Sequence, residues 1–344
     1  MATAALPRTA REVRLAARPD GLPEPRHFAV VRRPLTDPVP GRVLVRNEHF
    51  LVFPGLRTLI GGETEGLPLP ALASGDTLFG PAVGEVLAAP GDGPFRPGDR
   101  VVHMAGWRDH ALLPAADVTP VDPALPTPVA HLAQGSAPYG ALTRVAPVRT
   151  GDVVLVTGAA GAVGTLAGQI ARLLGAARVI GSTGSPHKAD RLVRELGYDH
   201  VLLCGPEYPP FAEQLRAAAP DGVDVVLDSV GGEQLAAALG AARQGARVAV
   251  VGALAGQLDA DRGGGTAPVE IDTFRLLVRG VSLGGYLGTD HPGVGAEWLE
   301  RFGGWLRSGA IRFPYSTVEG IDRAARALPE LIAGRHFGAV VVRL

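Results

Sequence analysis

The sequence predicts an α/β protein with two domains, one built on a doubly wound parallel sheet and one on a barrel-like set of antiparallel strands. Three observations predict this architecture. Residues 151–174 read as a strand, a glycine-rich turn and a helix; strand and helix patterns then alternate to residue 254; and residues 1–120 contain short strand-like runs. At 344 residues the chain is also long for a single hydrophobic core.

The first 120 residues have the pattern of an antiparallel β domain. Proline and glycine clusters separate the strand-like runs RHFAVVRRPL, GRVLVRNEHFLV, FGPAVGEVLAAP and DRVVHMAGWRDHALLP. The end of the chain supplies two helices and a closing strand, AVVVRL. If that strand rejoins the first domain, residues 1–122 and 281–344 form a catalytic domain and residues 123–280 form an inserted nucleotide-binding domain. The active site is then expected in the cleft between the two.

The glycine-rich turn predicts a dinucleotide site. The strand Val153–Val156 leads into Gly158, Gly161 and Gly164, and a helical pattern follows. A helix N-terminus presents unpaired N–H groups, and positions without side chains let a pyrophosphate approach the backbone. The spacing G-x-x-G-x-x-G differs from the commoner G-x-G-x-x-G, so the alternation of strands and helices after it carries much of the argument. Together they predict a Rossmann sheet.

The end of the second strand of this sheet favours NADP(H) over NAD(H). An NAD-binding fold carries a carboxylate there to bind the ribose hydroxyls, whereas residues 181–185 read GSTGS. Hydroxyl groups followed by Lys188 and Arg191 suit a 2′-phosphate instead, and Lys188 is the only lysine of the chain. The alternative is that Lys188 is a solvated residue at a helix start, since surface cations contribute little.

Composition and charge exclude several classes. The net charge of −1 argues against a nucleic-acid or membrane-surface protein, and no apolar run approaches the roughly 20 residues of a membrane span. The start of the chain lacks an apolar signal core, so we expect a cytoplasmic protein. Cys204 is the only cysteine, which excludes an internal disulfide and a four-cysteine zinc site. We expect no metal, because the histidines lack ligand-like spacing; His49, His103, His110 and His131, for example, are scattered through the N-terminal region.

Several segments together resemble one known family. They are GLPEPRHFAVVRRPL, GRVLVRN, GDRVVHMAGWRDH, VTGAAGAVGTLAGQIARLLG, GSPHKADRLVRELGYD and DSVGGE. Over nearly the whole chain they resemble the zinc-independent medium-chain dehydrogenases/reductases, in the prostaglandin reductase and 2-alkenal reductase branch, which is quinone oxidoreductase-like. The resemblance implies a GroES-like catalytic domain beside the Rossmann domain. It also implies NADPH-dependent reduction of a carbon–carbon double bond conjugated to a carbonyl group, with hydride delivered to the β-carbon.

The resemblance also implies roles for particular residues. Tyr286 falls where the family carries a tyrosine that donates to the substrate carbonyl or enolate oxygen; the alternative is an aromatic side chain that packs at an interface. Asn47 falls near the nicotinamide end of the cofactor, and His336 replaces a cofactor-side asparagine. The other expected cofactor-binding residues are Gly158, Ala159, Ala160, Gly161, Ala162, Val163, Gly164, Ser182, Ser185, Lys188, Ser229, Gly252 and Ala253.

This chain departs from the family pattern at the substrate end. Where the family reads V-D-P-Y-M-R, residues 52–57 read VFPGLR, so an acid and a tyrosine are missing. Phe53 and Gly55, with Tyr286, are expected to line a roomier and more apolar substrate pocket. Such a pocket suits a bulky hydrophobic substrate, for instance an intermediate of secondary metabolism. Cys204 stands where the family has a tyrosine by the adenosine phosphate, and Ser229 stands where it has an asparagine after the fourth strand.

Two other functions stay open at this point. A quinone reductase would use the same hydride donor, and a protein of this fold could hold NADPH without reducing anything or serve redox-neutral biosynthetic chemistry. The expected partners are a small molecule with a conjugated carbonyl and a second copy of the chain. The apolar run VSLGGYL (residues 281–287) is expected to be an edge strand that pairs with its symmetry mate in a homodimer.

Overall fold

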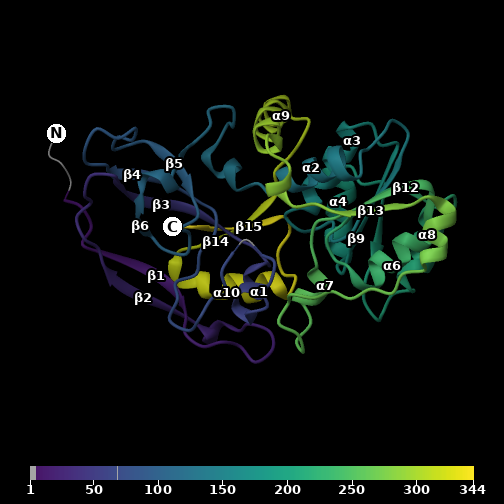
Figure 1. Ribbon diagram of the computed structural model, residues 1–344, viewed down its shortest axis with the longest axis horizontal. Coiled ribbons are helices and arrows are strands. Elements are labelled where there is room, and N and C mark those ends of the chain that lie inside the picture. Colours follow the sequence, from purple (N-terminus) through teal and green to yellow (C-terminus); the bar gives the residue numbers. More distant parts are fainter. Residues whose placement is uncertain (1–4, 68) are drawn as a thin grey trace. The chain divides into compact units, whose positions relative to one another are not determined.

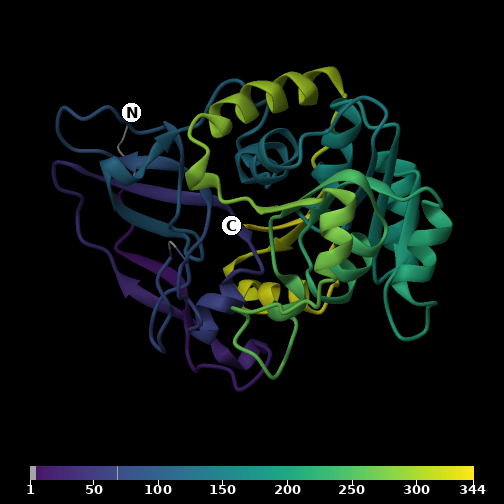
Figure 2. The same cartoon turned by 45° about the vertical axis from the view of Figure 1, so that its right-hand side comes forward.

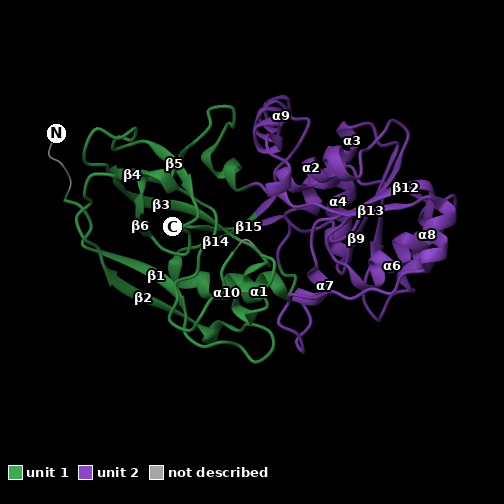
Figure 3. Cartoon of the chain, in the orientation of Figure 1, with its two compact units in different colours: residues 1–132, 316–335, 340–344 green, residues 133–315, 336–339 purple. Residues whose placement is uncertain are grey.

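The computed structural model describes residues 5–67 and 69–344 and divides the chain into two compact units (Figure 3). Unit 1 comprises residues 1–132, 316–335 and 340–344, and unit 2 comprises residues 133–315 and 336–339. The predicted domain boundaries after residues 122 and 280 stay a prediction. The predicted fold class is confirmed, because one unit carries a parallel sheet between helices and the other carries a separate antiparallel sheet (Figure 1).

The sheet of unit 1 is organised around its longest strand, β3 (Arg42–Val52). β3 pairs antiparallel with β4, β6 and β15, and β15 brings the end of the chain back to the first strands, as predicted. The sheet order is β14-β15-β3-β4-β5-β7, with β6 attached to β3. The bounds are β4 (Ala82–Ala88), β5 (Arg100–His103), β6 (His110–Pro114), β7 (Thr119–Pro120), β14 (Tyr315–Glu319) and β15 (Ala339–Arg343).

A hairpin and two helices complete unit 1. β1 (Thr9–Leu15) pairs antiparallel with β2 (Phe28–Pro34), and the amphipathic helix α10 (Ile321–Ile332) packs against both strands. The core between them includes Phe50, Trp107 and Leu328, together with α1 (Leu56–Gly61). Three single 3-10 turns are η1 (Pro25–His27), η2 (Ala115–Asp117) and η3 (Pro128–Leu132).

Unit 2 is built on six parallel strands in the order β10-β9-β8-β11-β12-β13. If these six strands are numbered from 1 to 6 along the chain, this is the doubly wound order 3-2-1-4-5-6. The Rossmann prediction is therefore confirmed. The order reverses between β8 and β11, whose carboxyl ends therefore flank the expected ligand position. The bounds are β8 (Val153–Val156), β9 (Arg178–Thr183), β10 (His200–Leu203), β11 (Val223–Asp228), β12 (Ala242–Val250) and β13 (Ser282–Gly285).

Helices cover this sheet on both faces (Figure 1). α5 and α6 bury Phe211, Leu215 and Leu235 against one face, and α3 and α4 pack against β8 and β9. Beside them, α9 packs on α2, which continues into the π-helical turn η4 (Figure 2). The bounds are α2 (Ser136–Gly140), η4 (Ala141–Val145), α3 (Gly164–Leu173), α4 (Pro186–Leu196), α5 (Phe211–Ala218), α6 (Gly232–Gly240), α7 (Leu254–Gln257), α8 (Thr273–Arg279), η5 (Gly288–Asp290) and α9 (Val294–Ser308). No helix of the described residues is long and apolar enough to cross a membrane.

Tyr198 fixes α3 to the sheet. Its buried hydroxyl donates to the Gly164 carbonyl oxygen at 2.6 Å, and its ring fills the space over Gly168 and Gly181. A Cβ atom built on Gly168 would lie 2.3 Å from the Tyr198 Cζ atom. The absence of side chains at Gly168 and Gly181 therefore leaves space for the Tyr198 ring. The ring in turn sets the distance between α3 and β9.

This packing predicts that Gly168→Ala destabilises the protein, although alanine is the better helix former. Because the added methyl group overlaps a buried ring, we expect a loss of about 1–3 kcal/mol in the free energy of unfolding. The matched control is Gly304→Ala in α9, where an added Cβ meets nothing within 4 Å. There helix propensity alone acts, and about 0.5–1 kcal/mol of stabilisation is expected. Urea unfolding measures both, and equal effects of the two substitutions would contradict the packing argument.

Candidate active site

The glycine turn after β8 is tightly packed at both ends and open in the middle. Gly158 has a φ of +62°, and a Cβ there would lie 2.8 Å from the Ser229 Oγ atom. At Gly164 a Cβ would lie 2.5 Å from both the Ala159 Cα atom and the Gly158 carbonyl oxygen. At Gly161 it would meet only the Gly158 oxygen, at 3.5 Å. Gly158 and Gly164 thus allow the turn to close, while Gly161 leaves open space above it.

The open part of the turn carries hydrogen-bond donors. Within the described chain, the backbone N–H groups of Val163 and Gly164 have no acceptor, as expected at the start of α3, whereas the Ala162 N–H faces the Gly338 carbonyl in the bridge between Gly161 and Gly338. Two N–H groups and the positive end of a helix dipole suit the negative charge of a diphosphate. The residues present therefore fit the diphosphate of a dinucleotide.

A buried hydrogen-bond network joins the carboxyl ends of β8 and β11. Thr157 donates through its hydroxyl to Asp228 Oδ1 at 2.7 Å, and Asp228 Oδ2 accepts from the Gly231 N–H at 2.8 Å. Ser229 Oγ donates to the Thr157 carbonyl oxygen at 2.9 Å. Burial raises the pKa of Asp228, and the donors around it oppose that rise. Ser229, a predicted cofactor contact, is therefore also part of the frame that holds the turn.

Ser182 lies beneath the turn. Its hydroxyl accepts from the Gly158 N–H at 3.0 Å and donates to Gln234 Oε1 at 2.7 Å, and its side chain is buried. In addition, the Ser182 carbonyl oxygen accepts from the Ala159 N–H. A contact between Ser182 and the 2′-phosphate stays a prediction, and the hydroxyl would have to give up its hydrogen bond to Gln234 to donate to a phosphate oxygen. Sequence reasoning missed Gln234, because only the fold brings α6 beside β9.

The other predicted phosphate residues lie on α4. Ser185 is the N-cap of the helix, where its hydroxyl accepts from the Lys188 N–H at 3.4 Å. Lys188 is half-buried, and burial lowers the pKa of its amine, so a neighbouring anion would be favourable there. Arg191 makes two hydrogen bonds to Glu195, at 2.7 and 2.9 Å, and lies 4.0 Å from the centroid of the Phe337 ring.

Residues 336–339 belong to unit 2 and lie against the glycine turn. The Gly338 N–H donates to the Ala160 carbonyl oxygen at 2.9 Å, and Gly338 forms an isolated bridge with Gly161. Gly338 has a φ of +76°, and a Cβ there would lie 2.2 Å from the Pro314 oxygen. Half-buried His336 lies two residues before Gly338 in the sequence, and its contact with the cofactor stays a prediction.

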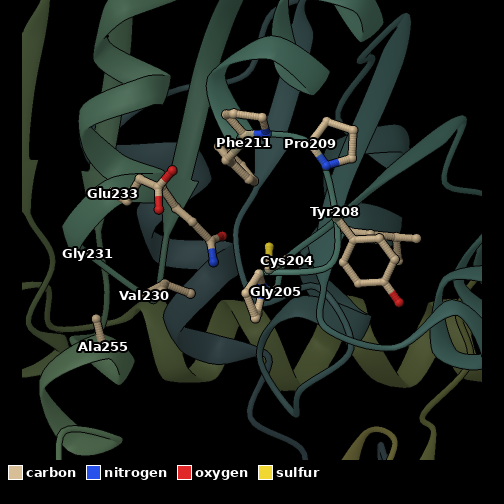
Figure 4. Close-up of a pocket in the computed structure, with 13 residues that line it drawn as sticks. Cys204, Gly205, Tyr208, Pro209, Phe211, Val230, Gly231, Glu233 and Ala255 are labelled. Carbon is tan, nitrogen blue, oxygen red and sulfur yellow. The ribbon is translucent and has the colours of Figure 1, made fainter.

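A cavity of about 510 Å³ opens beyond the carboxyl ends of β10 and β11 (Figure 4). Cys204 and Tyr208 line one side and Val230 and Glu233 the other, and burial raises the pKa of the Cys204 thiol. Of the remaining predicted cofactor residues, Gly252 packs against the backbone of Ser229, with a built Cβ 3.0 Å from its oxygen, and Ala253 precedes α7. The cavity has the size of a small-ligand site.

In unit 1 the predicted residues are held by the chain itself. Asn47 is buried, and its Nδ2 atom donates to the carbonyl oxygens of Ala105 at 3.0 Å and Arg108 at 2.8 Å. The Phe53 ring lies over Gly55, since a Cβ on Gly55 would be 3.1 Å from it. Phe53 therefore occupies part of the space that the family's missing tyrosine side chain would take.

The histidines of unit 1 are held by their surroundings, and His110 Nδ1 lies 3.0 Å from Asp109 Oδ1. Burial, aided by the charge of Arg108, lowers the pKa of His103 to about 4, and its Nδ1 atom accepts from the Ala105 N–H at 3.1 Å. Burial also lowers the pKa of His49 and of His131. Nowhere in the described ranges do three His, Cys, Asp or Glu side chains gather as a metal site would require.

Tyr286 directly follows β13, one residue beyond the strand in which it was predicted. Its backbone N–H donates to the Val250 oxygen at 2.9 Å, and its ring stacks on His291. Its hydroxyl lies against Gly140 at the end of α2. Burial raises the pKa of the phenol, and the charge of Arg144 opposes the rise. The structure thus gathers the predicted turn and α4 residues within unit 2, with Tyr286 in the same unit, and places Asn47, Phe53 and Gly55 in unit 1.

Comparison with known proteins now decides the family. A family model described as "Zinc-binding dehydrogenase" matches residues 162–301, and one described as "N-terminal domain of oxidoreductase" matches residues 11–121. Prostaglandin reductase 1 of Oryctolagus cuniculus is 30% identical over 283 residues, which cover 78% of this chain and 76% of that protein. This chain belongs to the zinc-independent medium-chain dehydrogenase/reductase family.

Two further relatives cover almost the whole chain. The NADPH-dependent curcumin reductase of Escherichia coli (strain K12) is 27% identical over 336 residues, covering 96% of this chain and 95% of that protein. The crystal structure of CurA in complex with NADPH from Vibrio vulnificus matches with a TM-score of 0.85 at 26% identity, covering 97% and 98% of the two chains. The resemblance seen in the sequence segments is therefore confirmed.

Proposed function

We infer that this family member reduces the carbon–carbon double bond of an α,β-unsaturated carbonyl compound with NADPH as its cofactor. The glycine turn is the observation that carries this conclusion in the structure, because its free N–H groups and the open space over Gly161 fit a diphosphate. No carboxylate stands at the end of β9 to repel a 2′-phosphate, and Lys188 lies five residues beyond that strand.

The residues divide into those that hold the cofactor and those that act on the substrate. NADPH supplies the hydride for the β-carbon when it is bound. Around the site, the N–H groups of Val163 and Gly164 bind phosphate oxygens, and Lys188 pairs with the 2′-phosphate. Tyr286 donates its O–H to the carbonyl oxygen of the substrate, where negative charge develops as hydride arrives. Burial raises the pKa of the phenol, which is consistent with a neutral O–H donor.

The substrate is proposed to be bulky and hydrophobic. Support comes from residues 52–57, where Phe53 and Gly55 replace an acid and a tyrosine of the family pattern. Loss of these polar groups removes hydrogen-bond partners that a small polar enal could use and leaves an aromatic face for apolar contact. A place in secondary metabolism and a cytoplasmic location stay predictions.

The first experiment is NADPH oxidation, followed by absorbance, with a panel of enones, enals, quinones and simple ketones. We expect oxidation with conjugated enones, fastest with bulky ones, and a product with two added hydrogens at the former alkene. Turnover of quinones alone would make the protein a quinone reductase instead. Tight NADPH binding without oxidation by any acceptor would identify a protein that holds the nucleotide without reducing a substrate.

Lys188→Ala tests the assignment of the 2′-phosphate. Removing a charge-assisted phosphate contact is expected to weaken NADPH binding by about 1.5–3 kcal/mol and to leave NADH binding nearly unchanged. Arg194→Ala is the matched control, because Arg194 is an exposed cation on the same helix, paired with Asp190. Titration calorimetry with both cofactors measures the difference. Equal losses for NADPH and NADH would place Lys188 away from the phosphate.

We further propose a homodimer formed through the edge of the unit 2 sheet. β13 is the last strand of the sheet, and large apolar side chains are exposed on it and on α8, including Leu277 at 75% and Phe274 at 69%. The others are Val278, Leu283 and Leu287. An open strand edge beside such a patch favours pairing with a second copy. Light scattering is expected to give twice 35.5 kDa, and Leu277→Glu to give a single chain of 35.5 kDa. A monomeric native protein would exclude the dimer.

A further inference from the structure

Tyr286 is held in place by the shape of two neighbours. On one side the imidazole of His291 stacks parallel to its ring, with centroids 4.9 Å apart and planes 2° apart. On the other, its hydroxyl end lies on Gly140, where a built Cβ would be 2.1 Å from the hydroxyl oxygen and 2.4 Å from the Cζ atom. No side chain fits at residue 140 while the phenol is in this position.

The phenol depends on this packing because no polar group holds it. Within the described residues the Tyr286 hydroxyl makes no hydrogen bond, and only its backbone N–H is fixed, by Val250. Rotation about its side-chain bonds would swing the hydroxyl through several ångströms. A hydrogen-bond donor to a reacting oxygen must lie within a few tenths of an ångström of its place to be effective.

The surface beneath the hydroxyl is rigid. Gly140 ends α2 and is followed by the π-helical turn η4, a rare turn that is frequent at functional sites. α9 anchors this region: the Tyr139 hydroxyl donates to Glu297 at 3.2 Å, and Trp298 packs so tightly on Gly135 that a Cβ there would be 2.0 Å from its ring. The absent side chain at residue 140 is therefore a fixed feature of the wall and is independent of loop motion.

His291 acts through its ring plane. It lies between η5 and α9, where its N–H donates to Gly288 at 3.3 Å and its carbonyl oxygen accepts from Val294 at 3.3 Å. Neither ring nitrogen hydrogen-bonds to a described residue. Parallel aromatic rings at this separation attract each other beyond the area that they bury, which favours the stacked orientation of the phenol by roughly twofold to tenfold.

We propose that Gly140 and His291 are positioning residues, which aim the Tyr286 hydroxyl at the carbonyl oxygen of the substrate. The proposal rests on the function inferred above and adds what sets the direction of the donor. It assigns no proton transfer to His291, because the stacked geometry presents the face of the imidazole to the phenol.

The test compares variants of the full-length protein with the best enone of the panel. Tyr286→Phe, which removes the donor, is the reference and is expected to lower kcat by about 100-fold with unchanged NADPH affinity. His291→Ala is expected to lower kcat by roughly twofold to tenfold, and Gly140→Ala, which places a methyl group where the hydroxyl lies, at least tenfold, both with unchanged NADPH affinity. His291→Phe keeps a flat ring and is expected to restore most of the kcat lost in His291→Ala. His200→Ala, an exposed histidine at the start of β10, is the control for histidine loss.

Double variants separate positioning from general damage. In the Tyr286→Phe background no hydroxyl remains to be aimed, so His291→Ala and Gly140→Ala are expected to lower kcat no further. Multiplicative losses there would overturn the proposal, and so would wild-type kcat in His291→Ala. His291→Phe as slow as His291→Ala would assign the effect to the imidazole nitrogens and also overturn it. Thermal unfolding of each variant shows whether a loss of activity is caused by a loss of folded protein.

The same series separates this inference from the function on which it rests. If Tyr286→Phe retains full kcat while the protein still reduces enones, the donor lies elsewhere and the proposed role of Tyr286 fails. If Tyr286→Phe is slow but both neighbours can be changed freely, the donor is correct and only the positioning argument fails. If no enone is reduced by the native protein, the proposed function itself fails.

Discussion

The hydrogen bond between Thr157 and Asp228 is the interaction on which the nucleotide site depends. It joins the carboxyl ends of β8 and β11, the two strands between which the sheet order reverses. Because Asp228 is fully buried, its carboxylate is costly to keep unless donors surround it, and it accepts from Thr157 and from the start of α6. Ser229 then fits under Gly158, and the turn closes with its free N–H groups directed outward.

Much of this site could be predicted from the sequence because it consists of local backbone geometry. Glycines at fixed spacing after an apolar strand have few interpretations, and the strand order follows from the alternation of elements. The Ser182 side chain could not be placed in this way. Side chains along a strand alternate between faces, but the sequence does not show that Gln234 lies beneath the turn, where it pairs with Ser182. Similarly, the helical spacing of Arg191 and Glu195 is consistent with their ion pair, but nothing in the pattern places Phe337, which is distant in the sequence, beside Arg191.

The surroundings of Tyr286 were beyond sequence reasoning for a different reason. Most of the Rossmann domain separates Gly140 from Tyr286 in the sequence. Among 47 glycines, nothing in the sequence marks Gly140 as the position that must lack a side chain. Its significance appears only when β13, α2 and the loop before α9 are folded together. The aromatic residues that anchor α2, Tyr139 and Trp298, have the same character, since each matters through a distant glycine or carboxylate.

Cofactor and substrate sites in this chain thus rest on different kinds of contact. The diphosphate is matched by backbone N–H groups and by the absence of side chains, so substitutions nearby, such as the cysteine at Cys204, leave the essential donors in place. The proposed substrate site, by contrast, depends on side chains whose identity and direction both count. In that proposal a change from a polar pair to Phe53 and Gly55 alters which molecule fits and leaves the glycine turn unchanged. Because the donors for the diphosphate belong to the backbone, selectivity for the substrate is free to change while that part of the cofactor site persists.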